Sequence, residues 1–138
     1  MNKTLSISGA IVFLLAGGVW WSKSLESNDP NIVATGGIHW HPQLEIYVKG
    51  EKQNIPQNIG LGVVHQPVHT HEDLPLLHLE FGGRVTKDDI KLGNFFRNWG
   101  KDMNEFGMNM KMAVNGEENT EFGDYVMRDK DKIELNFD

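Results

Sequence analysis

The sequence contains no cysteine, and it has no stretch in which basic residues dominate. The missing thiols exclude disulfide bonds, thiolate metal ligands and a cysteine nucleophile, so an apolar core must stabilise the fold. The formal net charge at pH 7 is −6, and an acidic surface without a basic stripe repels phosphate groups. We therefore expect no nucleic-acid partner.

One long run near the N-terminus lacks charge. Residues 5–21 read LSISGAIVFLLAGGVWW and lie between Lys3 and Lys23. As a helix this run rises about 25 Å, close to the ~30 Å hydrocarbon core of a bilayer, and the two closing tryptophans suit the membrane interface. No polar face interrupts the run, which disfavours a buried helix of a globular core. We predict a transmembrane anchor over residues 1–24.

The charges around this anchor predict its orientation. The amino terminus and Lys3 are positive, whereas the downstream chain is acidic, which favours an amino terminus on the cytoplasmic side. We expect a single-pass protein of the cytoplasmic membrane, held through residues 5–21, with its C-terminal domain on the extracytoplasmic side. A cleaved signal peptide is the alternative, although no Ala-x-Ala-like cleavage site follows the apolar run.

The composition changes after the anchor. Residues 25–37 read LESNDPNIVATGG, a polar segment rich in turn formers, and we predict a linker there. Residues 38–138 are then expected to form one soluble, histidine-rich domain, which is long enough for a single core. No internal repeat or low-complexity tract divides it.

Alternating apolar and polar residues predict strands in this domain. The first predicted strand ends before Gly50, another ends before the glycine pair at 82–83, and a third runs into the hairpin signal of Asn115 and Gly116. An arm broken by Pro56 is either a return strand or irregular. The predicted segments are residues 44–48, 55–59, 76–81, 110–114 and 133–137.

One segment has helical periodicity instead. Its apolar residues lie three or four positions apart, and the pattern stops at Gly100. Thr86 and Asp89 resemble a capping box, so the helix could begin there. The residues of the apolar face are Leu92, Phe95, Phe96 and Trp99.

The order of these segments predicts an α+β fold, in which a mixed β-sheet packs against one main helix in a β-grasp-like arrangement. Residues 110–137 are similar to the second half of ubiquitin-like domains, with a strand, a turn, a short Asp-Tyr turn, a charged turn and a final strand. A β-sandwich of the cupredoxin type is the alternative, and the central helix argues against it.

All six histidines lie between positions 39 and 78. Four of them form His-x-His pairs, a spacing that puts both imidazoles on one face of an extended strand. His78 is expected to share a strand face with Glu80, whereas His65 lies outside the pairs and is not expected to take part. Imidazole is the commonest protein ligand for metals, and such a cluster can supply three or four ligands. The candidate metal ligands are His39, His41, His69, His71 and His78.

These ligands predict a non-enzymatic module that binds copper or zinc. Four methionines form a second enrichment, and thioethers bind Cu(I), which would favour copper. Met110 and Met112, however, alternate with Lys111 in a predicted strand, so we assign them to the core. The four methionines are Met103, Met108, Met110 and Met112.

Other uses of the histidines stay open. They could be wholly structural, or they could form a network with nearby carboxylates that titrates at about pH 6. Either use would fit a non-catalytic interaction subunit of a membrane protein complex, with histidines that are structural or proton-linked. The nearby carboxylates are Glu72, Asp73 and Glu80.

Residues 69–73 read HTHED and resemble the start of the H-x-H-x-D-H motif of metallo-hydrolases. Leu74 occupies the position of the last histidine, and no histidine follows His78. A metal-dependent enzyme would also need a general base, for which only the three carboxylates above are identifiable. The sequence therefore favours a protein without catalytic activity.

Four motifs occur in the order HWHPQLEIYVKG, IPQNIGLG, HTHEDLPLLHLEF and LGNFFRNWG. This combination resembles a family of small exported or membrane-anchored proteins of bacteria and archaea. The resemblance covers residues 38–138 and implies the architecture and the recurrence of five histidine positions, but no activity. The matching positions are His39, His41, His69, His71 and His78.

The chain departs from the pattern of this family after the second His-x-His pair. Members typically read H-T-H-D followed by G-I-I-H, with a turn that contains glycine. Here Glu72, Leu74 and Pro75 stand at the corresponding positions, and an aspartate follows one place later as Asp73. The role that the resemblance implies for this aspartate is therefore open.

Overall fold

The structure is a computed structural model that describes residues 3–24 and 29–138. The chain divides into two compact units, Met1–Pro30 and Asn31–Asp138. The first unit contains one helix, α1 (Lys3–Ser24), which carries Lys23 in its last turn. Within the described ranges, no helix is both long and apolar enough to cross a membrane. The transmembrane role of residues 1–24 therefore stays a prediction.

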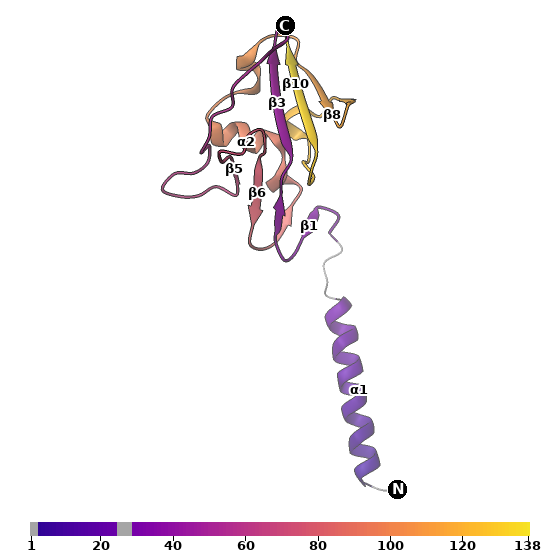
Figure 1. The fold of residues 1–138 in the computed structure, drawn as a ribbon. Helices are drawn as coiled ribbons and strands as arrows, with labels where there is room; N and C mark the ends of the chain where they lie inside the picture. Colours follow the sequence, from indigo (N-terminus) through magenta and orange to yellow (C-terminus); the bar gives the residue numbers. More distant parts are fainter. Residues whose placement is uncertain (1–2, 25–28) are drawn as a thin grey trace. The chain divides into compact units, whose positions relative to one another are not determined.

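The second unit contains three β-sheets and the helix α2 (Figure 1). Together with α1 this is a mixed α+β structure, as predicted at that level. Short 3-10 helices lie at Asp88–Ile90, Met103–Phe106 and Phe122–Asp124. The strands and α2 are β1 (Ile32–Ala34), β2 (Ile38–Trp40), β3 (Gln43–Val48), β4 (Glu51–Lys52), β5 (Val68–His69), β6 (His78–Phe81), β7 (Val85–Thr86), α2 (Leu92–Trp99), β8 (Lys111–Val114), β9 (Glu117–Asn119) and β10 (Lys132–Phe137).

The largest sheet has the order β4-β3-β10-β8-β9. The central strand β10 runs parallel to β3 and antiparallel to β8, so two segments far apart in the sequence become neighbours. Alternation along these strands directs one set of side chains into the core, where Ile46, Ile133 and Leu135 are fully or almost fully buried. The predicted strands near 44–48, 110–114 and 133–137 are therefore confirmed.

Two predicted strands differ from the structure. The strand expected over residues 76–81 is present only from His78, because residues 76–77 precede the pairing with β2 and β5. The arm over residues 55–59 forms no strand and is irregular, which was one of its two expected forms. Its buried side chains, Ile55 and Ile59, still belong to the core.

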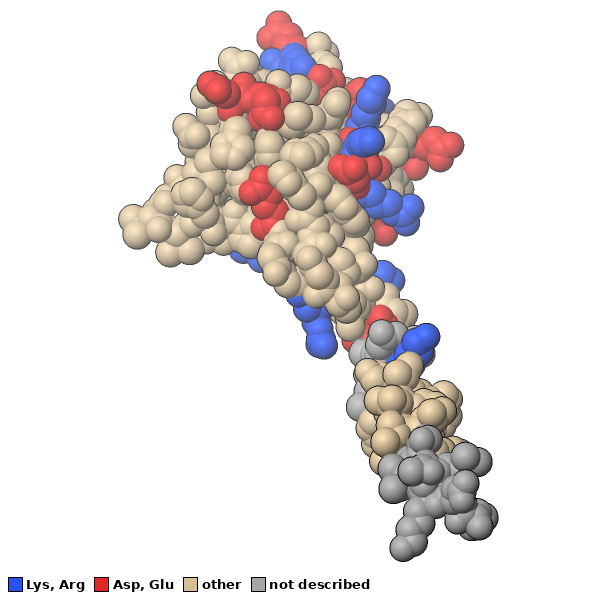
Figure 2. Space-filling view, turned by 60° about the horizontal axis from the view of Figure 1, so that its bottom comes forward, with Lys and Arg blue, Asp and Glu red and all other residues tan. Residues whose placement is uncertain are grey.

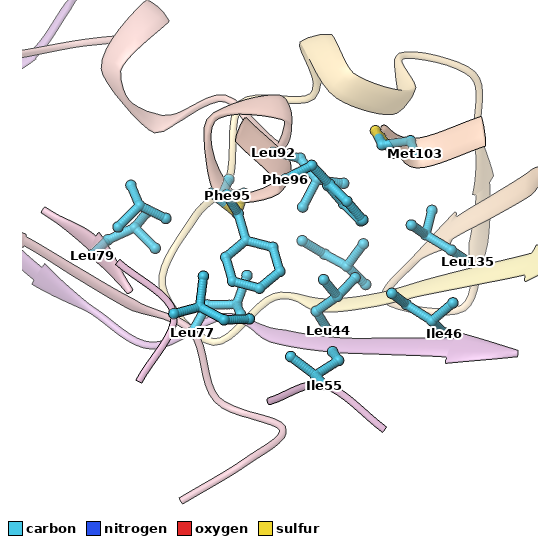
Figure 3. Packing of buried hydrophobic residues seen from close by; sticks show 14 of the residues in the cluster. Leu44, Ile46, Ile55, Leu77, Leu79, Leu92, Phe95, Phe96, Met103 and Leu135 are labelled. Carbon is cyan, nitrogen blue, oxygen red and sulfur yellow. The ribbon is translucent and has the colours of Figure 1, made fainter. Parts of the chain in front are cut away.

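Helix α2 covers the core with its apolar face. Figure 3 shows the Phe95 side chain pointing from α2 toward Leu77 and Leu44, and all three residues are fully buried. The helix ends at Gly100, whose φ of 72° is the left-handed conformation that glycine adopts at little cost. The predicted end of the helix is therefore confirmed.

The expected start of this helix at Thr86 is wrong. Both the backbone N–H and the hydroxyl of Thr86 donate to Asp89, but the residues that follow form the short 3-10 helix Asp88–Ile90 instead of an α-helix. Lys91 is extended, with a ψ of 141°, and this separates the turn from α2. Gly93 inside α2 has a packing reason, because an added Cβ would lie 3.0 Å from the carbonyl oxygen of Gly123.

The folded second unit begins earlier than predicted. β1 lies within the segment 25–37 that was expected to be a linker, and it pairs with β7. A backbone hydrogen bond from Lys87 to Asn31 extends this contact. Residues 25–28 of the expected linker lie outside the described residues.

We predict that replacing Phe95 with alanine destabilises the second unit by about 3–5 kcal/mol, because it removes a fully buried ring from the centre of the core. Urea-induced unfolding followed by tryptophan fluorescence measures this change. Met108→Ala is the control, since its side chain is 75 % exposed and its loss should change stability by no more than about 0.5 kcal/mol. Equal midpoints for the two variants would contradict the packing described for α2.

Candidate metal centre

The three-stranded sheet brings the histidine segments together. Its order is β2-β6-β5, so β6 lies between two strands that each lead into a His-x-His pair. In the antiparallel pairing, His39 is opposite Glu80 and His69 is opposite His78. Residues directly opposite each other share a face of the sheet, as do residues two apart on one strand. His39, His69, His78 and Glu80 therefore lie on one face.

His78 is at the centre of this cluster. Its ring centroid lies 4.6 Å from that of His71, 4.7 Å from that of His41 and 5.5 Å from that of His69. His39 is linked to the group through His41, with ring centroids 4.7 Å apart. All five histidines predicted from the sequence are thus neighbours in space. His65 is exposed and forms part of neither candidate metal group described below.

Two groups of side chains could each hold a metal ion. In each group every member offers one ligand atom, and these atoms lie within 4.8 Å of one another. His78 belongs to both groups. The inner group consists of His69, His71, His78 and Glu80, and the outer group consists of His39, His41 and His78.

Glu80 was not among the predicted ligands. The sequence indicated that Glu80 shares a strand face with His78. It could not indicate how close Glu80 lies to the pair His69 and His71, because that distance depends on how β5 and β6 pair. Oε1 of Glu80 lies 3.7 Å from Nδ1 of His78 and 3.0 Å from Nε2 of His39. One carboxylate oxygen therefore lies beside members of both groups.

His69 has a defined tautomer. Its Nδ1 lies 2.9 Å from the carbonyl oxygen of Gln66, which can only accept, so Nδ1 carries the proton and donates. Burial lowers the pKa of the His69 imidazole and favours the neutral ring. Nε2 of this ring therefore accepts a hydrogen bond, which Nε2–H of His71 donates over 3.2 Å. Two imidazole nitrogens thus converge on one point.

His78 has the opposite tautomer. Its Nε2 lies 3.0 and 3.1 Å from the two carboxylate oxygens of Asp73. The hydrogen bond with His78 lowers the pKa of Asp73, which keeps the carboxylate ionised and able only to accept. In the neutral ring Nε2 therefore carries the proton, and Nδ1 presents the lone pair. This Nδ1 is buried and has no hydrogen-bond partner.

A buried polar atom without a partner is costly, at about 1–3 kcal/mol, and is uncommon in native proteins. At His78 this atom lies 3.7 Å from Oε1 of Glu80, and His78 as a residue belongs to both groups. The contact from Asp73 to the far nitrogen has the form of the carboxylate–histidine–metal arrangement, in which the carboxylate orients the ligating ring. The orientation of His78 therefore fits that of a metal-ligating histidine.

The remaining candidates lie apart from this arrangement. Glu72 is exposed and belongs to neither group. Met112 is buried in the core and Met110 packs against it, in agreement with their assignment to packing. Met103 is also buried in the core, whereas Met108 is exposed.

No protein-family model, no curated protein and no solved structure matches this chain. The family resemblance of residues 38–138 therefore stays a prediction.

We predict that the metal-free protein holds His69 as the Nδ1–H tautomer and His78 as the Nε2–H tautomer, because Gln66 and Asp73 each accept from one nitrogen. Long-range ¹H–¹⁵N correlation spectra above neutral pH distinguish the two forms. In Asp73→Ala, His78 should lose its preference while His69 keeps its own. An Nδ1–H form of His78 in the unsubstituted protein would contradict the assignment.

Proposed function

We propose that this protein is a membrane-anchored, extracytoplasmic metal-binding protein whose histidine cluster holds a copper or zinc ion. The observation that carries the proposal is Nδ1 of His78, a buried lone pair without a partner at the centre of five histidines. A buried imidazole nitrogen without a partner has lost its hydration, and a bound cation compensates for that loss.

The inner group suits a borderline divalent ion. It offers three imidazole nitrogens and one carboxylate oxygen, which is the number of donors that a tetrahedral zinc site requires. Cu²⁺ accepts the same donor types, whereas Cu(I) prefers thiolate and thioether sulfur. The sequence has no cysteine, and three of the methionines discussed above serve packing, so the donor set favours the divalent ions.

The topology of the second unit supports a β-grasp interpretation of its main sheet. β10 is central, the hairpin β3-β4 lies on one side of it, and the hairpin β8-β9 lies on the other. The helix α2 connects the two halves in the sequence, between the strand pairs that flank β10. We therefore propose a β-grasp fold for the second unit.

The first unit supports the membrane part of the proposal. Its described apolar side chains point into open space on all sides of α1, and Figure 2 shows the described part of this helix almost free of charge. A helix that is apolar all round needs an apolar environment, which lipid supplies. The exposed residues are Ile11, Val12, Phe13, Leu14, Leu15, Val19, Trp20 and Trp21.

We predict that the purified full-length chain, treated with chelator and then titrated with Zn²⁺ and Cu²⁺, binds one of these ions with near-stoichiometric capacity. The variant His69→Ala/His71→Ala should bind it more weakly by over about 100-fold, because loss of a single outer-shell partner already costs about 10–100-fold. Calorimetry in the presence of a competing chelator measures both affinities.

His65→Ala is the matched control, because His65 is an exposed histidine outside both groups. It should bind the ion like the unsubstituted chain. Binding that survives in His69→Ala/His71→Ala, or no binding by the unsubstituted chain, would overturn the proposed metal site.

We predict that the full-length chain stays in the membrane pellet after alkaline carbonate extraction, and that Phe13→Lys/Leu14→Lys releases it. Each lysine at the centre of a membrane helix costs about 2.5–3.5 kcal/mol. The control Val63→Lys/Val64→Lys adds the same charges to an exposed loop of the second unit and should stay in the pellet. An unsubstituted chain found in the soluble fraction would argue against an anchor.

A second candidate function is favoured by that loop. Val63 is completely exposed and Val64 is 70 % exposed, although both are apolar. Side chains of this kind are typical of protein contacts. They support a non-catalytic interaction subunit of a membrane protein complex, which would be isolated in one stable complex whether or not metal is present.

A further inference from the structure

We propose that the cluster holds one ion at a time, and that the outer group receives the ion from solvent and passes it to the inner group. The inference rests on the proposed function, because it requires an ion bound to the histidines. Three observations support this inference. His78 belongs to both groups, the two groups differ in burial, and Glu80 lies beside members of both.

The shared residue limits the capacity of the cluster. His78 belongs to both groups, but a neutral imidazole has a single lone pair. Asp73 holds the proton on Nε2 with two contacts, so only Nδ1 can ligate. Two ions could share His78 only if its ring lost that proton and Asp73 moved away. The inner and outer groups therefore exclude each other.

The two groups differ in their access to solvent. The side chain of His39 in the outer group is 65 % exposed, whereas His69 and His78 are only 4 % and 7 % exposed as residues. Two of the four inner members are buried, against one of the three outer members, although His71 and Glu80 of the inner group also reach the surface. The outer group is therefore the more accessible of the two to an ion that arrives from solvent.

The inner group is the better final position. It offers four donors against three, and two of its rings are already oriented, His69 by the Gln66 carbonyl and His78 by the Asp73 carboxylate. Ligands that are held in place before binding lose less conformational entropy when the ion arrives. At equilibrium the ion therefore occupies the inner group.

Glu80 connects the two positions. Its Oε1 lies 3.0 Å from Nε2 of His39 and 3.7 Å from Nδ1 of His78. A carboxylate that is half exposed can turn from one neighbour to the other while it stays bound to the ion. With His78 it supplies the donors that an ion retains while it exchanges the outer histidines for His69 and His71.

The test uses the full-length, metal-free chain in detergent and Zn²⁺ as the probe. Competition titration gives the number of ions and the affinity, and stopped-flow measurement with a zinc-sensitive dye gives the rate of loading. The variant His39→Ala/His41→Ala removes the outer pair, and His39→Gln/His41→Gln does so while it keeps polar side chains on the surface. His65→Ala is again the matched control.

We expect one ion per unsubstituted chain. The two outer-pair variants should keep that capacity and an affinity within about tenfold of the unsubstituted value, but load at least about tenfold more slowly, because they lack the exposed donors. His65→Ala should match the unsubstituted chain in both measurements.

Three results would overturn the inference. Two ions per chain would show that the groups do not exclude each other, and an unchanged loading rate in both outer-pair variants would remove the receiving role. A loss of affinity in those variants as large as that in His69→Ala/His71→Ala would show that all five histidines act as one site. No zinc or copper binding by the unsubstituted chain would instead overturn the proposed function, and the two failures are therefore distinguishable.

Discussion

The pairing of β6 with β2 on one side and β5 on the other is the constraint on which the site depends. It places His39 opposite Glu80 and His69 opposite His78, and it brings two separate His-x-His pairs to one strand. The apolar residues of β6 hold this strand in register, since Leu79 is fully buried in the core. Because a slip by one residue would turn every side chain to the other face, core packing and the geometry of the histidine cluster are set by the same register.

The proposed metal site and a purely structural use of the histidines differ in what they imply for Nδ1 of His78. An unpartnered buried atom of this kind costs about 1–3 kcal/mol, which a folded domain can tolerate. A structural cluster would be expected to satisfy all of its nitrogens, as Gln66 satisfies Nδ1 of His69. At His78 the nitrogen without a partner belongs to the residue that both candidate groups share.

Local chemistry explains which elements of the fold could be predicted. The strands β3 and β10 and the end of α2 at Gly100 follow from alternation, helical spacing and a left-handed glycine, which are properties of neighbouring residues. The strand β1 was missed because its partner β7 lies about 50 residues away, and no local pattern indicates such a pairing. The early helix start was predicted from the Thr86–Asp89 contact, which does form but leads into an extended Lys91.

The sequence by itself determined the types of ligand and their spacing. It has no thiols, its histidines are confined to one third of the chain, and the period of a strand places the members of each pair on one face. Only the tertiary structure decided that β6 lies between the two pairs, that Glu80 joins them and that His78 belongs to both groups. The physical reason is that spacing within a strand is local, whereas the distance between segments depends on strand pairing and on the core that stabilises it.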